Sequence, residues 1–373
     1  MKTICHITTG LNIGGAEMFL VNLASALKSH GYKQTIISLL GEGDLSDKVK
    51  NENIELIHLG INRYPWTWWL ILKLPFLLRR VSPDIVQTWL YHADLIGGLA
   101  AMFIKTKLIW NVRQTDISVK NNKREIVFIA RITALLSKYL PIKIICCSES
   151  VKTSHIDIGY NESRIVVIPN GCDTSLYKYD KGRRETIRSA LSIDENDVAI
   201  GRFGRFDPQK DYKNFILAAD KIQSLHQGVW FLVAGENISY ENPTLMKWIN
   251  RCLVPEHFVL LGKRNDLPDL YQAVDIMVSS SLGEGFPNVI AEAMSSEVPS
   301  VVTDVGESGG LVGDAGRVVP KEDSKKLADA CLELINIGET ERRKLGEAAR
   351  SRIVNFYSLD RSVTEYRELY DQF

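Results

Sequence analysis

The fold is decided by residues 283–294, which read Gly-Glu-Gly-Phe-Pro-Asn-Val-Ile-Ala-Glu-Ala-Met. The preceding residues 275–281 predict a short buried strand that ends in small polar side chains. Gly283 and Gly285 allow a tight turn, and Pro287 suits the first turn of a helix, where its missing N–H costs nothing. A glycine-rich turn that opens a helix directs N–H groups and the positive end of the helix dipole at one point. The stretch therefore predicts an anion site with a phosphate as its guest.

Two acids of this stretch, Glu284 and Glu292, are separated by seven residues. If both extend the helix, they lie about 12 Å apart along its axis, because each residue rises ~1.5 Å. That separation is too large for one shared proton and suits the two ends of a sugar nucleotide. The simpler alternative for the spacing alone is a pair of surface glutamates on an ordinary helix.

The strand, the turn and the helix with its two glutamates resemble the signature of family 4 glycosyltransferases, which are retaining enzymes of the GT-B fold. The resemblance implies an α/β protein with two Rossmann-like parallel-sheet domains facing a cleft. Alternation of short apolar runs with helical stretches along the whole chain also favours parallel sheets wrapped by helices. Strands are expected at residues 4–7, 34–40, 55–59, 85–88, 107–111, 143–147, 165–168, 198–203, 229–234, 259–261 and 275–281, with a strand and turn at 300–306.

The chain length of 373 residues favours two domains. The turn Pro-Asn-Gly-Cys-Asp at residues 169–173 resembles the sequence that family members show at the boundary between the two domains. We therefore expect an acceptor-binding domain at 1–172 and a nucleotide-sugar-binding domain at 173–355. The resemblance further implies that a terminal helix at 356–373 crosses back to the first domain.

Composition is that of a soluble globular protein, with 45% hydrophobic and 24% charged residues. Formal net charge is zero, yet residues 1–172 hold 20 Lys and Arg against 13 Asp and Glu, and residues 173–373 hold 25 against 32. A basic amino-terminal half suits an anionic surface such as a membrane face, and chance unevenness is the alternative. No nucleic-acid partner is expected.

Six cysteines without a C-x-x-C pair indicate reduced, buried thiols in a cytoplasmic protein. The apolar run at the amino terminus is too short, ending before Gly10, to predict a signal peptide. The sequence has no run of eighteen apolar residues, so no membrane-spanning helix is expected.

Residues 204–211 supply the expected cations of the donor site. Arg205 and Lys210 follow a strand, and together they can clamp a diphosphate, Arg through its planar fork and Lys as a point charge. The pattern resembles the family motif G-R-x-x-x-x-K-G, although Asp211 stands where the glycine is usual.

The resemblance also assigns roles to the other donor-site residues. Glu292 would accept hydrogen bonds from the ribose hydroxyls, Glu284 would orient the sugar, and Lys263 or Arg264 would border the base. The catalytic set is thus Glu284, Arg205 and Lys210. The remaining donor-binding residues are Gly15, Gly285, Phe286, Pro287, Asn288 and Val289.

Acceptor contacts are expected at the carboxyl ends of strands in the amino-terminal half, where open α/β sheets place their sites. The candidates there are Arg113, Gln114 and Asp116, together with His92. Many members of the family carry a histidine near Arg113, and this chain has none there. The resemblance implies no metal and no cofactor, so cationic side chains would neutralise the leaving diphosphate.

Residues 64–80 hold three of the seven tryptophans, many leucines and a basic end. Such a segment can lie in a bilayer interface or receive a lipid chain, and a buried helix with a basic cap is the alternative. A membrane contact here would place the protein at the inner face of the plasma membrane.

The resemblance implies a glycosyltransferase that moves a sugar from a nucleoside-diphosphate donor, most often UDP in the family, to a sugar acceptor. The segment at 64–80 favours a polyprenyl-linked acceptor of cell-surface polysaccharide assembly, such as O-antigen. Two alternatives share the architecture: a nucleotide-sugar 2-epimerase and a non-catalytic nucleotide-sugar-binding subunit. A dehydrogenase is disfavoured, because the G-x-G-x-x-G fingerprint is missing at residues 10–17.

Overall fold

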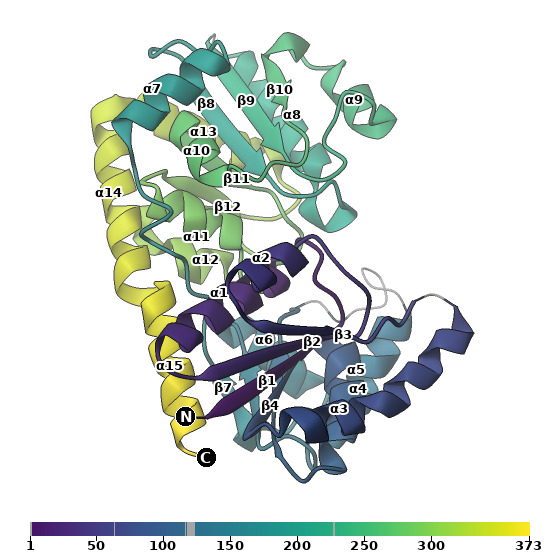
Figure 1. Cartoon of the computed structure of the whole chain (residues 1–373). Coiled ribbons are helices and arrows are strands. Elements are labelled where there is room, and N and C mark those ends of the chain that lie inside the picture. Colours follow the sequence, from purple (N-terminus) through teal and green to yellow (C-terminus); the bar gives the residue numbers. More distant parts are fainter. Residues whose placement is uncertain (1, 63, 116, 118–123, 227) are drawn as a thin grey trace. The chain divides into compact units, whose positions relative to one another are not determined.

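The computed structural model describes residues 2–62, 64–115, 117, 124–226 and 228–373. It divides into two compact units: unit 1 comprises Met1–Gly171 with Leu359–Phe373, and unit 2 comprises Cys172–Ser358. Each unit is a parallel sheet covered by helices (Figure 1). The predicted α/β class with two Rossmann-like domains is therefore confirmed.

Unit 1 contains a seven-stranded parallel sheet in the order β3-β2-β1-β4-β5-β6-β7. Its strands are β1 (Thr3–Thr8), β2 (Lys33–Ser38), β3 (Glu55–His58), β4 (Ile85–Trp89), β5 (Lys107–Val112), β6 (Lys143–Cys146) and β7 (Ile165–Val167). Its helices are α1 (Gly15–Ser29), α2 (Ser46–Asn51), α3 (Leu74–Val81), α4 (Leu90–Met102), α5 (Arg124–Leu136), α6 (Glu149–Asp157) and α15 (Leu359–Asp371), with 3-10 helices η1 (Pro65–Lys73) and η2 (Glu162–Arg164).

The central strands of unit 1 are buried on both faces, as helices on both sides of a parallel sheet require. His6 in β1 is fully buried and links its two neighbouring strands. Its Nδ1 accepts a hydrogen bond from Trp89 Nε1 on β4 (3.2 Å), so its Nε2 carries the proton and donates to Gln34 Oε1 on β2 (2.9 Å). Burial lowers the pKa of His6 to about 4, while the hydrogen bond to Gln34 opposes that shift.

Helix α15 is part of the core of unit 1, although it lies at the end of the chain. Val363, Tyr366 and Tyr370 are buried in one cluster with α1 and the central strands. The Tyr366 hydroxyl accepts hydrogen bonds from Asn111 Nδ2 (2.8 Å) and Arg113 Nη2 (2.7 Å). At the other end of the helix, a Cβ on Gly171 would lie 2.4 Å from Leu359 Cα, so the chain leaves unit 1 and returns to it side by side.

Unit 2 contains a six-stranded parallel sheet in the order β10-β9-β8-β11-β12-β13. Its strands are β8 (Val198–Phe203), β9 (Val229–Ala234), β10 (Phe258–Leu260), β11 (Ile276–Ser279), β12 (Ser300–Thr303) and β13 (Gly316–Val319). Its helices are α7 (Lys181–Ala190), α8 (Tyr212–Gln223), α9 (Pro243–Ile249), α10 (Leu267–Ala273), α11 (Asn288–Ser295), α12 (Ser308–Val312), α13 (Ser324–Asn336) and α14 (Gly338–Phe356), with η3 (Pro208–Lys210), η4 (Pro255–His257) and η5 (Gly313–Ala315).

All six cysteines are buried free thiols. No helix within the described ranges combines the length and the apolarity needed to cross a bilayer.

Candidate functional site

The order of the strands in unit 2 places its switch point between β8 and β11. From β8 the chain continues outward to β9 and β10, and from β11 it continues in the opposite direction to β12 and β13. The loops after the two central strands therefore diverge and leave a crevice at their carboxyl ends, where open α/β sheets bind ligands. Arg205 and Lys210 follow β8, and Glu284 follows β11, so topology alone brings the predicted catalytic residues together.

Lys210 and Glu284 form a largely buried ion pair across this switch point. Lys210 Nζ lies 2.6 Å from Glu284 Oε1, and the two side chains are 20% and 10% exposed. Ser281 Oγ donates a second hydrogen bond to the same carboxylate oxygen at 2.7 Å. Burial raises the pKa of the Glu284 carboxyl, but the charge and hydrogen bond of Lys210 outweigh burial and hold that pKa below its ordinary value. The carboxylate is therefore ionised at neutral pH.

Arg202 lies beneath this pair, fully buried in β8. Its guanidinium donates to the carbonyls of Lys210 (2.7 Å) and Phe203 (2.9 Å) and to Ser280 Oγ (3.3 Å). It also stacks on the Tyr212 ring at 4.8 Å. Arg202 thus fixes the backbone that carries Lys210 to the loop after β11. Arg202 was not among the predicted site residues. The feature that could have indicated it is a charged residue inside the apolar run of β8.

Arg205 differs from Arg202 in its surroundings. Its side chain is 54% exposed, and its Nε makes a loose ion pair with Asp207 Oδ2 at 3.4 Å. An exposed guanidinium at the edge of the crevice can turn to an anionic ligand at little cost. The family motif usually has a glycine where this chain has Asp211. Asp211 has φ 43° and ψ 57°, a left-handed conformation that glycine favours and Asp tolerates.

Helix α11 begins at Asn288, as predicted, with Pro287 at its N-cap. The Asn288 N–H donates to the Phe286 carbonyl at 3.0 Å, so in this conformation it is not available to a phosphate. Pro287 has no N–H, and the predicted set of amides is therefore smaller than the sequence indicated. Glu292 lies further along α11, where its Oε2 accepts a hydrogen bond from Tyr271 OH at 2.8 Å. An ionised carboxylate has further lone pairs for ribose hydroxyls.

Two glycines outside the quoted motifs support the site loops. A Cβ on Gly306 (φ 55°) would lie 1.6 Å from the Glu284 carbonyl oxygen. A Cβ on Gly235 (φ 152°) would lie 1.9 Å from the Gly204 carbonyl oxygen. Each glycine lets a neighbouring loop approach the backbone next to a predicted catalytic residue. The sequence shows these glycines after strands, but it does not show what they touch.

Lys263 and Arg264 follow β10, on the same side of the switch point as β8 and β9. Both are exposed. Arg264 is engaged by a bidentate pair with Asp266 (Nε–Oδ1 2.8 Å and Nη2–Oδ2 2.5 Å). Their predicted contact with the base stays a prediction.

The switch point of unit 1 lies between β1 and β4. Gly15 is exposed at the start of α1, which follows β1. His92 is half-buried near the start of α4, and burial lowers its pKa. Leu90 at the junction of β4 and α4 has φ 70°, which is strained for a bulky side chain and is typical of functional sites.

Arg113 and Gln114 follow β5, and the third candidate, Asp116, lies outside the described residues. The Arg113 guanidinium contacts the Phe19 and Trp89 rings at 4.7 and 4.9 Å and donates to Asn111, Asn170 and Tyr366. Arg113 therefore ties β5 to α15 within unit 1. Its predicted contact with an acceptor would have to compete with these bonds.

Lys210 and Glu284 thus meet at the switch point of unit 2. The family models match the two units in turn. A model described as "Glycosyltransferase Family 4" matches residues 13–176, and one described as "Glycosyl transferases group 1" matches residues 183–352. The chain belongs to the family 4 glycosyltransferases. Its fold is GT-B, as predicted, and the resemblance of the 283–294 stretch to this family is confirmed.

Similar family members are bacterial. An Escherichia coli protein named UDP-Gal:alpha-D-GlcNAc-diphosphoundecaprenol alpha-1,3-galactosyltransferase is 24% identical over 80% of this chain and 78% of its own length. The Staphylococcus aureus capsular polysaccharide biosynthesis glycosyltransferase CapM is 29% identical over 81% and 80%. The crystal structure of Anabaena HepE in complex with UDP-glucose superposes with a TM-score of 0.88 at 21% identity over all of both chains.

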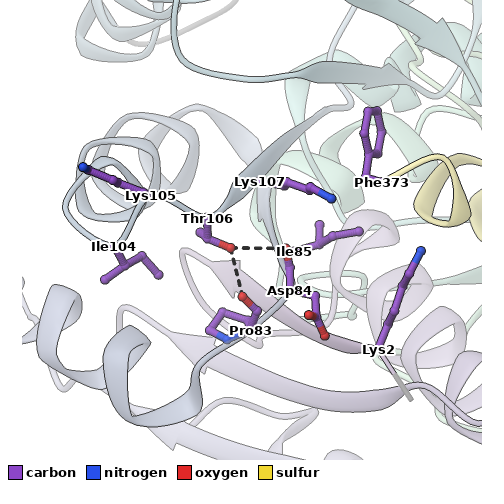
Figure 2. Close-up of a pocket in the computed structure, with 9 residues that line it drawn as sticks. All are labelled: Lys2, Pro83, Asp84, Ile85, Ile104, Lys105, Thr106, Lys107 and Phe373. Carbon is purple, nitrogen blue, oxygen red and sulfur yellow. Dashed lines mark hydrogen bonds between the residues drawn. The ribbon is translucent and has the colours of Figure 1, made fainter.

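A cavity of about 290 Å³ lies at the amino ends of β1, β4 and β5, and its lining includes Lys2, Asp84, Lys107 and Phe373 (Figure 2). Thr106 Oγ1 closes one wall by donating to the Pro83 carbonyl at 2.9 Å. This is the end of the sheet opposite to that at which α/β folds place their ligands, so the cavity is not a candidate active site. Within the described ranges, no group of three His, Cys, Asp or Glu side chains could hold a metal ion.

Proposed function

We propose that this glycosyltransferase transfers a sugar from a UDP-sugar, with retention of configuration, to a polyprenyl-linked sugar in cell-surface polysaccharide assembly. The observation that carries the donor half is the ion pair of Lys210 and Glu284 at the switch point of unit 2. The crystal structure of HepE with UDP-glucose and the activity named for the E. coli relative support the choice of donor and acceptor.

The chemistry follows from the charges at the crevice. Departure of the diphosphate concentrates negative charge, and cations held in advance stabilise that change. The Lys210 ammonium has three donors, and only one is needed for Glu284. Arg205 is free to swing from its loose contact with Asp207. We propose that these two cations, rather than a divalent metal, neutralise the leaving group.

Glu284 in this proposal orients the hydroxyls of the transferred sugar. Its carboxylate is held by Lys210 and Ser281 at one oxygen, Oε1, so its direction is fixed before the donor arrives. Glu292 anchors the ribose from the other end of the motif, with Tyr271 holding its Oε2. The leaving phosphate then helps to deprotonate the acceptor on the same face, which retains configuration.

Replacement of Lys210 tests the donor site. Lys210→Ala should lower kcat by at least about a hundredfold, because it removes transition-state charge stabilisation worth roughly 3 kcal/mol or more. Transfer would be followed with radiolabelled UDP-sugars and a polyprenyl-diphosphate sugar. Glu292→Ala should instead raise the Kd for UDP, measured by calorimetry, and normal values in both variants would contradict the assignment.

Incubation of the wild type with UDP-sugar alone separates the alternatives. A 2-epimerase would change the sugar without an acceptor. A binding subunit would bind UDP but transfer to none of the acceptors.

We also propose that residues 64–80 contact the membrane that carries the acceptor. Trp66, Trp68 and Trp69 are 69%, 60% and 56% exposed, which excludes the alternative of a fully buried helix. Leu74 and Leu78 are buried and attach the segment to unit 1. Replacement of the three tryptophans by Ser should weaken binding to anionic vesicles and leave UDP binding unchanged.

A further inference from the structure

Helix α5 carries an unusual outward stripe. Arg124, Phe128, Arg131 and Leu135 follow one another at spacings of four, three and four, so they lie on one face of the helix, and all four are exposed. Phe128 and Leu135 are 65% and 67% exposed. Lys138 and Tyr139 continue the stripe in the turn after the helix. Cations and large apolar side chains thus alternate along a face that the described residues of unit 1 leave exposed.

The opposite face of α5 anchors it. Val127, Ala130, Thr133 and Ala134 are buried, and α5 packs on α4, which in turn packs on α3. The three helices form one layer beside the sheet (Figure 1). Three neighbouring helices at interaxial distances of 8–10 Å make a layer roughly 20 Å wide. Of the three helices, α4 contacts β4 and β5 directly, and α3 and α5 pack against α4.

Large apolar side chains are exposed on or just after all three helices and on η1, which packs on α3. They are Trp66, Trp68, Trp69 and Leu72 on η1, Phe76 on α3, Leu99, Met102 and Phe103 at the end of α4, and Phe128, Leu135 and Tyr139 on or after α5. We call this set, with the cations among it, the helical platform. Isolated exposed apolar residues are ordinary, but a concentration on adjacent elements marks an interaction surface.

The charge of the platform is one-sided. Exposed cations on its elements and their ends are Lys73, Arg79, Arg80, Lys105, Arg124, Arg131 and Lys138. By the same measure, the exposed carboxylates of the described residues on these elements and their ends are Glu125 and Asp84. Lys73 also lies 4.5 Å from the Trp69 ring centroid, so a cation and an aromatic side chain share one spot.

We propose that the whole helical platform, and not the 64–80 segment alone, is a docking surface for an anionic phospholipid bilayer. Cations interleaved with aromatic and aliphatic side chains suit an interface in which phosphate groups lie just above acyl chains. A protein partner would be better matched by an apolar centre with its charges at the rim. The proposal deepens the acceptor part of the proposed function, on which it rests.

Variants of α5 test the proposal, because this helix lies outside the 64–80 segment. The full chain would be sedimented with vesicles of phosphatidylcholine alone or mixed with phosphatidylglycerol, without nucleotide. Arg124→Gln with Arg131→Gln should weaken binding to the anionic vesicles by more than tenfold, at roughly fivefold for each cation. Phe128→Ser with Leu135→Ser should weaken it by a similar factor.

Matched controls come from unit 2. Leu225→Ser with Leu253→Ser removes side chains of nearly equal exposure, 62% and 65%, and should leave vesicle binding unchanged. Lys247→Gln with Lys325→Gln removes two exposed cations of unit 2 and is the control for Arg124→Gln with Arg131→Gln. Unaltered circular dichroism and Tm in each variant would show that the fold is intact.

A second measurement reports contact directly. Since the native cysteines are all buried, Phe128→Cys and Leu135→Cys can be labelled selectively with an environment-sensitive dye. The emission should shift to the blue with anionic vesicles at both positions and stay unchanged for Leu225→Cys.

Three results would overturn the proposal: α5 variants that bind vesicles as the wild type does, equal binding to neutral and anionic vesicles, or a self-association that the α5 variants abolish. If the wild type bound no vesicles yet transferred sugar to a soluble acceptor, the platform would be contradicted and the proposed function would stand. Vesicle binding by a chain that transfers no sugar would do the reverse.

Discussion

Two arginines three positions apart show how burial decides the role of one residue type. Arg202 is fully buried and donates to backbone carbonyls and serine hydroxyls, whereas Arg205 is more than half exposed with one loose partner. Arg202 holds the site together, and Arg205 remains free for a ligand. Of these two arginines, the family motif includes only Arg205. The motif describes the residues expected to bind the ligand, and it does not include the buried residue that holds their backbone in place.

Methionine at each position should separate these roles. Arg202→Met leaves buried carbonyls and hydroxyls without donors and should lower the free energy of unfolding by roughly 3 kcal/mol. Arg205→Met, at an exposed position, should change stability by less than about 0.5 kcal/mol. It should weaken UDP binding by about tenfold or more, because a charge-assisted hydrogen bond is lost. Urea unfolding and calorimetry measure the two; an unstable Arg205→Met with normal UDP affinity would contradict the assignment.

The loops at the ends of strands depend on close backbone approaches. Gly306 after β12 lies against the Glu284 carbonyl, so the position of the predicted catalytic carboxylate depends on a residue that follows another strand. Gly338 provides a matched control, because its φ of 81° is also positive and nothing lies within 4 Å of its missing Cβ.

Alanine at these two glycines should have different consequences. Both substitutions strain the backbone by about 1–2 kcal/mol. Gly306→Ala must in addition displace Glu284, so kcat/KM should fall on the order of a hundredfold, as for a misplaced catalytic group. Gly338→Ala should keep the wild-type kcat/KM. Equal activity of the two variants would show that the contact at Glu284 has no bearing on catalysis.

Strand β1 and helix α6 each hold a buried neutral histidine. Burial lowers the pKa of His6 and of His155 to about 4, against an ordinary value of 6.5. The unfolded chain therefore binds more protons than the folded chain between pH 6.5 and 4. The contribution of these two residues to stability is complete above pH 6.5 and is lost as the pH falls through this window.

Near pH 5, each pH unit of acidification should lower the free energy of unfolding by about 2.7 kcal/mol, because unfolding then takes up about two protons, one for each histidine. Urea unfolding at several pH values measures this slope. In His6→Gln one titrating ring is gone, so the slope should drop by about half. An unchanged slope would mean that the folded His6 already carries a proton.

Most of the sheet could be predicted from local pattern, because strands of a parallel sheet are short apolar runs. The strand that the pattern did not indicate is β13, an edge strand of only four residues in which Arg317 and Val318 are not buried. Local sequence also could not show that Arg113 is held by Asn170 and Tyr366, since these partners are 57 and 253 positions away. The parts of the candidate site that lie in two short segments, residues 204–211 and 283–292, could be predicted from local sequence. The site was not predictable where a distant glycine or a buried arginine supports those segments.

At the scale of the whole molecule, the two units differ in how the chain builds them. Unit 2 is one continuous segment, whereas unit 1 takes its last helix from the far end of the chain. Tyr366 and Tyr370 on α15 are fully buried, and Tyr370 OH donates to Gln87 on β4.

Deletion of residues 359–373 should therefore unfold unit 1 and spare unit 2. The deletion removes four buried apolar side chains, those of Val363, Tyr366, Leu369 and Tyr370. Their loss, at about 2 kcal/mol each, together with the hydrogen bonds to Asn111 and Gln87, approaches or exceeds the usual stability margin of a domain. Limited proteolysis should leave a resistant fragment near 172–358 that still binds UDP. A truncated chain with both units resistant would contradict this division.

The side-by-side exit and return of the chain at Gly171 and Leu359 has a consequence for biosynthesis. Unit 2 can fold as soon as residue 358 has left the ribosome, while the seven strands of unit 1, made first, must wait for the last fifteen residues. During translation the amino-terminal half therefore exists as an incomplete core with its α15 groove open. The unit made first is finished last, and a nascent chain stalled before residue 359 would present that open groove to chaperones.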